Sequence, residues 1–200
     1  MRFIAFVLAA LFISGPAAAQ QWKEYAYIVE GFAVSFPNEP QVEDVEMYQI
    51  IPGKNVPAHI YSSSFNGGTF KVTVADARDG NLQEGPVLDN AVNKLTQGGT
   101  KKIDFPHRIY RIYGRQFSVE RPNGGLTTAA VFFANERLYV IESTRPRGGN
   151  DSDLIKFQQS LVFDRNVANR SRQQMEAIRA SCVGINANPA GLDDPRCTRK

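Results

Sequence analysis

The residues that could do chemistry in this sequence lie closest together at Asp104 and His107. A carboxylate beside an imidazole can act as a general acid–base pair. A bend at Pro106 could bring these two side chains together, with Arg108 and Tyr110 following on the same stretch. Such a site would suit a hydrolase. A surface salt contact beside a proline turn is the alternative, and we favour it because no nucleophile or metal-ligand set accompanies the pair.

The other reactive side chains do not form a recognisable site. Ser62, Ser63 and Ser64 form a run of hydroxyls, but the sequence around them lacks the G-x-S-x-G elbow and a neighbouring set of histidine and aspartate. His59 and His107 are too distant from each other and from the cysteines to show metal-ligand spacing. We therefore expect no catalytic residue, no cofactor and no metal site, which indicates that the protein is not an enzyme.

The two cysteines, Cys182 and Cys197, both lie near the C-terminus. In an oxidising compartment we expect them to form a disulfide that restrains the tail. Two unrelated free thiols are the alternative, which we consider weaker because exposed thiols seldom stay reduced in such a compartment.

The N-terminus has the three parts of a secretory signal peptide. Arg2 is followed by an apolar run from Phe3 to Ile13 and by the small residues Ala17 and Ala19. We expect residues 1–19 to be removed by cleavage between Ala19 and Gln20, so that the mature protein is periplasmic or secreted. A membrane anchor is the alternative, but a bilayer span takes about 20 apolar residues. No later segment is apolar for long enough to span a membrane.

The formal net charge of +3 is a weak imbalance. The basic residues gather at residues 108–115 and in an arginine-rich tail after residue 164. We interpret them as a solvated surface rather than a site for nucleic acid or anionic lipid, and export argues further against nucleic acid. Association with the envelope surface through the arginine-rich tail is a weaker alternative.

Two apolar runs are expected to form the centre of the fold. Residues 129–134 have no polar side chain on either alternating face, which indicates a strand covered on both sides, and residues 138–141 follow as its hairpin partner. A helix that starts near Asn150 carries an apolar stripe and can lie on this hairpin. We expect Phe132 and Phe157 to be buried in one core between them.

Turn residues predict the other elements. Asn66-Gly67 favours a tight hairpin between residues 59–65 and 69–75. Residues 41–49 fit either an exposed edge strand or an irregular linker. The remaining predicted elements are a strand over residues 31–37, further strands over 103–105, 109–113 and 116–120, and a helix from Pro86 to the glycines at 98 and 99.

Two motifs carry a resemblance to a known family. The pattern G-F-x-V-x-F-P occurs at residues 31–37, and F-x-x-S-L-x-F occurs at residues 157–163. With this order of elements, residues 22–164 resemble the PsbP-like superfamily, which includes Mog-type and LpqN-type proteins and many exported bacterial domains of unknown function. The resemblance implies an α+β fold, an α/β/α sandwich with a central antiparallel sheet. This domain would span residues 20–164, followed by a peripheral C-terminal helix and disulfide-tied tail at 165–200.

Members of that superfamily act mainly as accessory or binding proteins and share no catalytic set, so no functional residue is carried over. We therefore expect an exported, non-enzymatic binding or assembly protein of the bacterial envelope. Its partner would be an envelope protein or a small ligand, without nucleic acid and without a stable membrane span.

Overall fold

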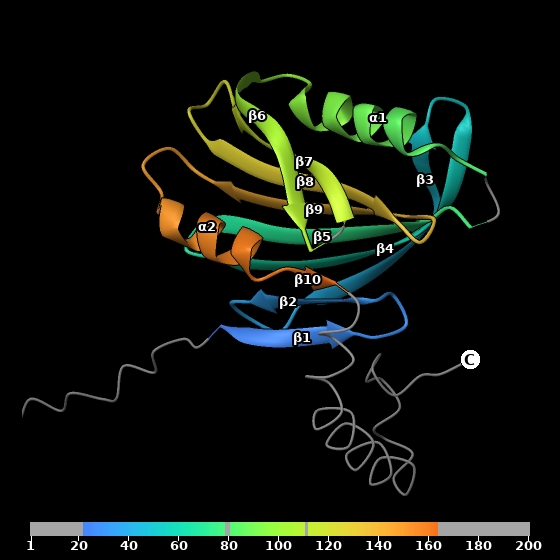
Figure 1. Ribbon diagram of the computed structural model, residues 1–200. Helices are drawn as coiled ribbons and strands as arrows, with labels where there is room; N and C mark the ends of the chain where they lie inside the picture. Colours follow the sequence, from blue (N-terminus) through green and yellow to red (C-terminus); the bar gives the residue numbers. More distant parts are fainter. Residues whose placement is uncertain (1–21, 79–80, 111, 164–200) are drawn as a thin grey trace, which may run out of the picture.

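A computed structural model describes residues 22–78, 81–110 and 112–163. They form an α+β fold in which antiparallel strands dominate, as the sequence predicts (Figure 1). The predicted signal peptide with its cleavage site at Ala19 and Gln20 lies outside the described residues, as does the tail with Cys182 and Cys197. No helix within the described ranges is long and apolar enough to cross a membrane.

The larger sheet has the order β3-β4-β5-β9-β8-β7-β6, with every neighbouring pair antiparallel. Its middle strand is β9, which pairs on one side with β5, a strand far away in the sequence. Its members are β3 (Gln41–Ile51), β4 (Lys54–Phe65), β5 (Gly68–Asp76), β6 (Thr100–Ile109), β7 (Ile112–Glu120), β8 (Leu126–Ala134) and β9 (Arg137–Arg145).

Both predicted hairpins are confirmed. Asn66 and Gly67 connect β4 to β5 with φ angles of 50° and 73°, and Asn135 and Glu136 connect β8 to β9 with φ angles of 50° and 55°. Positive φ at both central residues is the backbone of a two-residue turn whose twist matches that of paired strands. Residues 129–132 of β8 are buried on both faces, as expected of an inner strand.

The structure settles or corrects two other predictions about strands. Residues 41–49 belong to β3, so they form an edge strand and not a linker. The three pieces predicted between residues 103 and 120 are in fact the two long strands β6 and β7. Pro106 does not bend the chain, because it pairs with Arg115 inside β6 at the outer edge of the sheet. Proline is tolerated there since its missing N–H would have no ladder partner.

A second, smaller sheet has the order β1-β2-β10 and was not predicted as a separate sheet. Its strands are β1 (Lys23–Tyr27), β2 (Phe32–Phe36) and β10 (Val162–Phe163). The expected strand at residues 31–37 is β2, which lies between the aromatic entry segment and the end of the described chain. The sequence motifs at residues 31–37 and 157–163 therefore each contribute a strand to this sheet.

Helix α1 (Glu84–Thr96) covers one face of the larger sheet, as Figure 1 shows. Its buried face consists of Val87, Leu88, Ala91 and Val92. Its C-terminal end is held by Arg121 of the β7–β8 connection, whose guanidinium donates hydrogen bonds to the carbonyls of Leu95 and Gln97. A cation at the negative end of a helix satisfies carbonyls that have no partner within the helix.

Helix α2 (Asp151–Gln159) and the smaller sheet cover the opposite face (Figure 1). The Asn150 side chain caps α2 by accepting a hydrogen bond from the backbone N–H of Ser152. Phe157 packs its ring 5.2 Å from that of Phe36 and 5.3 Å from that of Phe70. Phe157 and Phe132 are fully buried in the same cluster, so the expectation of one shared core is confirmed.

One glycine of the larger sheet, Gly114, has no room for a methyl group. A Cβ on Gly114 would lie 2.2 Å from the carbonyl oxygen of Val131 and 2.5 Å from the Phe132 ring. Gly114→Ala should therefore lower the free energy of unfolding by about 1 to 3 kcal/mol, measured by urea denaturation. Gly85→Ala is the control: it has open space in the first turn of α1 and should be neutral or stabilising. A Gly114→Ala protein as stable as the parent would contradict the β7–β8 packing.

Candidate functional site

The structure does not bring Asp104 and His107 together. They lie three positions apart in the continuous strand β6, so their side chains point to opposite faces. Asp104 accepts hydrogen bonds from Arg115 at 2.5 Å and from Lys101 at 2.6 Å on the α1 face. Burial would raise the pKa of Asp104, but the hydrogen bonds and charges of Arg115 and Lys101 outweigh it and lower that pKa. Asp104 is thus a satisfied ion-pair partner.

His107 packs on the other face of the same strand. It pairs with Gly114 across the ladder, and its ring lies 5.7 Å from that of Phe132. Burial lowers the pKa of His107 and so favours the neutral ring. This histidine is a packing residue at the rim of the aromatic core, without a carboxylate to orient it within the described residues.

The serine run lies beside a shallow polar hollow. The hollow has a volume of about 250 Å³ and is lined by Ser62, Ser63 and Ser64 together with Asn38, Glu39 and Gln41 at the start of β3. The Ser63 hydroxyl is buried and has no hydrogen-bond partner in the described structure. No histidine lines this hollow, so the described residues supply no base for a serine nucleophile there.

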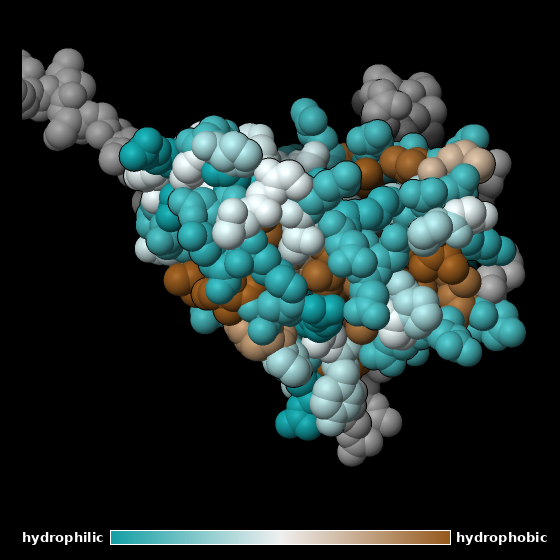
Figure 2. Space-filling model, turned by 90° about the horizontal axis from the view of Figure 1, so that it is seen from above, coloured by the Kyte–Doolittle hydropathy of each residue, from teal (hydrophilic) through white to brown (hydrophobic). Residues whose placement is uncertain are grey.

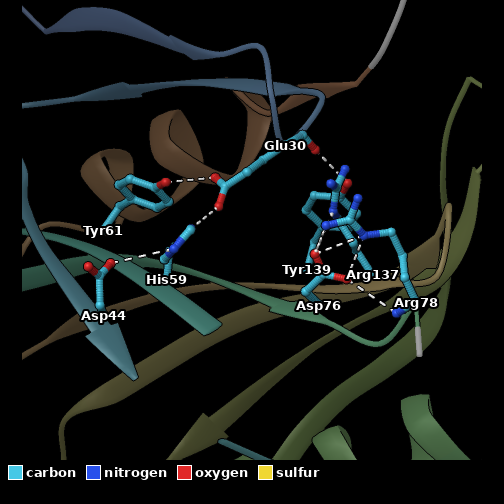
Figure 3. Close-up of polar contacts among 8 residues, drawn as sticks. All are labelled: Glu30, Asp44, His59, Tyr61, Asp76, Arg78, Arg137 and Tyr139. Atoms are coloured by element: carbon cyan, nitrogen blue, oxygen red, sulfur yellow. Dashed lines mark hydrogen bonds and ion pairs between the residues drawn. The ribbon is translucent and has the colours of Figure 1, made fainter. Parts of the chain in front are cut away.

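A polar network centred on Glu30 was not predicted from the sequence. Glu30 lies in the turn between β1 and β2, and its carboxylate is buried between the two sheets, with 10% of the side chain exposed. Tyr61 donates its hydroxyl hydrogen to Glu30 Oε2 at 2.7 Å, and His59 Nδ1 lies 2.5 Å from Glu30 Oε1 (Figure 3). A carboxylate oxygen accepts the hydrogen of this contact when His59 is in the tautomer that carries it on Nδ1.

The network ties the β1–β2 turn to β4 and β9. His59 and Tyr61 are alternate residues of β4 and therefore face the smaller sheet together. Tyr139 of β9 donates its hydroxyl hydrogen to the backbone carbonyl of Glu30 at 2.6 Å. The turn closes through Gly31, whose φ of 77° is easily adopted only by glycine.

Two charged groups border this network (Figure 3). On the β3 side, His59 Nε2 lies 3.5 Å from Asp44 Oδ1, where the His59 side chain is 51% exposed and that of Asp44 is 82% exposed. On the β9 side, Asp76 pairs with Arg78 and more distantly with Arg137. Hydrogen bonds from Arg78, opposed by burial, lower the pKa of Asp76.

The geometry around Glu30 fits a structural clamp better than a reaction centre. Both carboxylate oxygens of Glu30 are occupied from within the protein. Burial, together with the charge and hydrogen bond of Glu30, raises the pKa of Tyr61 and keeps its hydroxyl protonated as a donor. Among the described residues, no three His, Cys, Asp or Glu side chains are grouped so that they could hold a metal ion.

The turn that joins β6 to β7 carries a second candidate, which we call the ribbon tip: Arg108, Tyr110 and Tyr113. Tyr110 and Tyr113 are 57% and 61% exposed. Arg108 pairs with Tyr113 across the ladder and holds its guanidinium 5.7 Å from the centre of that ring. Tyr110 has a φ of 54°, a conformation that costs a bulky side chain about 1 to 2 kcal/mol. The tip thus exposes two aromatic rings and a cation.

Comparisons with known proteins add little to this picture. No protein-family model and no curated protein matches the sequence. Among solved structures, the chain aligns with the solution structure of cyanobacterial PsbP (CyanoP) from Synechocystis sp. PCC 6803. The TM-score is 0.45 and the sequence identity 13%, over 76% of this chain and 98% of that one. At this TM-score we derive neither family membership nor any residue role from the match.

The clamp interpretation predicts unequal costs for changes at Glu30. Glu30→Ala should lower the free energy of unfolding by about 1 to 3 kcal/mol, because it leaves the buried Tyr61 hydroxyl without its acceptor. Glu30→Gln keeps an acceptor of the same shape and should cost less. Asp44→Ala, on the exposed side of His59, should cost under about 1 kcal/mol. Chemical denaturation ranks the three variants, and equal costs for Glu30→Ala and Asp44→Ala would contradict a buried clamp.

Tyr61 also predicts how stability depends on pH. Its pKa is raised in the folded state, so its contribution is fully present below about pH 10 and is lost as the pH rises above that value. The slope should reach about 1.4 kcal/mol per pH unit for each such tyrosine. Burial also raises the pKa of Tyr48 and Tyr139, so Tyr61→Phe should make the alkaline decline shallower without abolishing it. Denaturation between pH 8 and pH 11.5 measures this, and an unchanged slope in Tyr61→Phe would contradict it.

Proposed function

We propose that this protein is an exported, non-enzymatic accessory protein that binds a partner protein through the ribbon tip. The observation that carries the proposal is the exposure of Tyr110 and Tyr113 around Arg108 at the end of one hairpin. Tyrosine and arginine are the residues in which the binding energy of protein interfaces is concentrated, together with tryptophan. Exposing two large rings to water without a partner has no benefit for folding.

The surroundings of the tip support protein binding. On the face of β6 opposite Arg108, Ile103 and Phe105 are 54% and 43% exposed. Figure 2 looks onto the α1 side of the molecule and shows hydrophobic surface only as separate patches among hydrophilic side chains. The tip thus presents exposed aromatic rings within a mostly polar surface, which is the composition of an interface core with its rim.

The outer edge of β6 favours contact through side chains over the addition of a partner strand. Lys101, Lys102 and Pro106 lie along this edge. Lysine and proline at an open edge discourage pairing with another strand, because charges must be desolvated and proline offers no N–H. The partner is therefore expected to contact the tip itself.

The proposal includes export and a PsbP-like relationship. Export is supported by the signal-peptide pattern of residues 1–19. The relationship is supported by the two motifs at residues 31–37 and 157–163, which lie in the β1–β2–β10 sheet and at the end of α2. The hydrolase alternative near Asp104 and His107 lacks support, since the two side chains point apart.

The test compares tip variants of the tagged full-length protein produced in its own organism. Tyr110→Ala combined with Tyr113→Ala should reduce recovery of a specific, cross-linked partner from the periplasmic or secreted fraction at least tenfold. The matched control is Ile155→Ala, which removes an apolar side chain that is 53% exposed on α2, away from the tip. Equal recovery with the double variant and with the control would contradict the proposal. An unchanged melting temperature of both variants establishes that folding is not the cause.

A further inference from the structure

We propose that the ribbon tip recognises a carboxylate-rich segment of its partner protein; the inference rests on the proposed function and adds the chemistry of the partner. The tip is basic by sequence as well as by structure. Residues 105–115 contain three arginines and no carboxylate. The three residues of the tip are one cation and two aromatic rings.

Arg108 differs in its contacts from most other arginines of the described structure. Carboxylates of the same chain pair with Arg78, Arg137 and Arg145. Aromatic rings are contacted by three lysines, Lys23, Lys94 and Lys156. Arg115, on the same ribbon, pairs with both Asp89 and Asp104. Arg108 lies against the Tyr113 ring and hydroxyl instead, and no carboxylate of the described residues forms an ion pair with it.

The way Arg108 is held suits a carboxylate. A guanidinium has five N–H donors in a planar fork, and the contact with the Tyr113 hydroxyl, at 3.4 Å, engages only one nitrogen, Nη1. Stacking on the ring restricts the side chain in advance, which reduces the entropy lost when a ligand binds. The remaining donors can grip a carboxylate through two parallel hydrogen bonds.

The two tyrosines explain why a polypeptide fits better than a lipid surface. Attraction to anionic lipids grows with the number of basic residues near the surface, at about 1 kcal/mol for each. Within the described residues the tip offers one arginine without a carboxylate partner, beside two exposed rings. Rings of this kind can make apolar contacts with a bound peptide, and their hydroxyl groups can form hydrogen bonds with it. An acidic peptide with neighbouring apolar side chains would use all three residues.

The experiment reads binding residue by residue, so that the arginine-rich tail cannot be mistaken for the tip. The ¹⁵N-labelled protein, complete from Gln20 to Lys200, is titrated with acetylated tetraglutamate and followed by NMR. The amides of Arg108, Tyr110 and Tyr113 should shift saturably. Arg108→Gln should raise the dissociation constant read from the tip amides at least fivefold, and Arg108→Lys should give an intermediate value because it restores only a point charge.

The matched control is Arg147→Gln, which removes another exposed arginine and should change the dissociation constant less than twofold. Absent shifts at the tip, or equal effects of Arg108→Gln and Arg147→Gln, would overturn the inference. Arg108-dependent sedimentation with phosphatidylglycerol vesicles, without peptide binding, would also overturn it and assign the tip to lipid. If cellular capture of a partner requires Tyr110 and Tyr113 but tolerates Arg108→Gln, the acidic partner is wrong while the proposed function stands.

Discussion

The fold depends on one constraint: the inner strands of the larger sheet are apolar on both faces, so both faces must be covered. Along β8, Val131 belongs to the cluster under α1, whereas Phe132 belongs to the cluster under α2 and the smaller sheet. Burial of apolar surface on each face stabilises the folded state by roughly 25 cal/mol per Å² of apolar area. The two layers around the sheet are therefore a consequence of this one strand pattern, and Phe157 of α2 completes the second of them.

Covering the second face with the smaller sheet buries polar groups of Glu30 that need hydrogen-bond partners. The β1–β2 turn ends against β4 and β9, where a buried backbone carbonyl and a buried carboxylate would be costly without partners. Tyr139 satisfies the carbonyl, and Tyr61 and His59 satisfy the carboxylate. Such a network fixes the position of the β1–β2 turn more than it adds net stability, because its hydrogen bonds mainly offset the desolvation of the groups they join. It fixes where the smaller sheet lies.

Local patterns in the sequence predicted the local structure well and the long-range structure poorly. Both helices and the Asn66-Gly67 hairpin depend on neighbouring residues, and all are confirmed. Pairing of β5 with β9 and the second sheet depend on residues far apart, which periodicity does not report. Glu30 and His59 are 29 positions apart, so no spacing rule joins them. The strand expected at residues 109–113 contains the actual β6–β7 turn, because Tyr110 takes a turn conformation without an Asn-Gly signal.

The ribbon tip is a part of the described structure that the packing of the core does not explain. Tyr110 is strained and exposed, and Arg108 contacts an aromatic ring, whereas Arg78, Arg115, Arg137 and Arg145 each pair with a carboxylate. The most direct test places a photoreactive amino acid at position 110, or at position 155 on α2 as the reference, in the protein in its own cells. Our account predicts one dominant protein adduct from position 110 and none from position 155. The same adducts from both positions, or none from position 110, would contradict it.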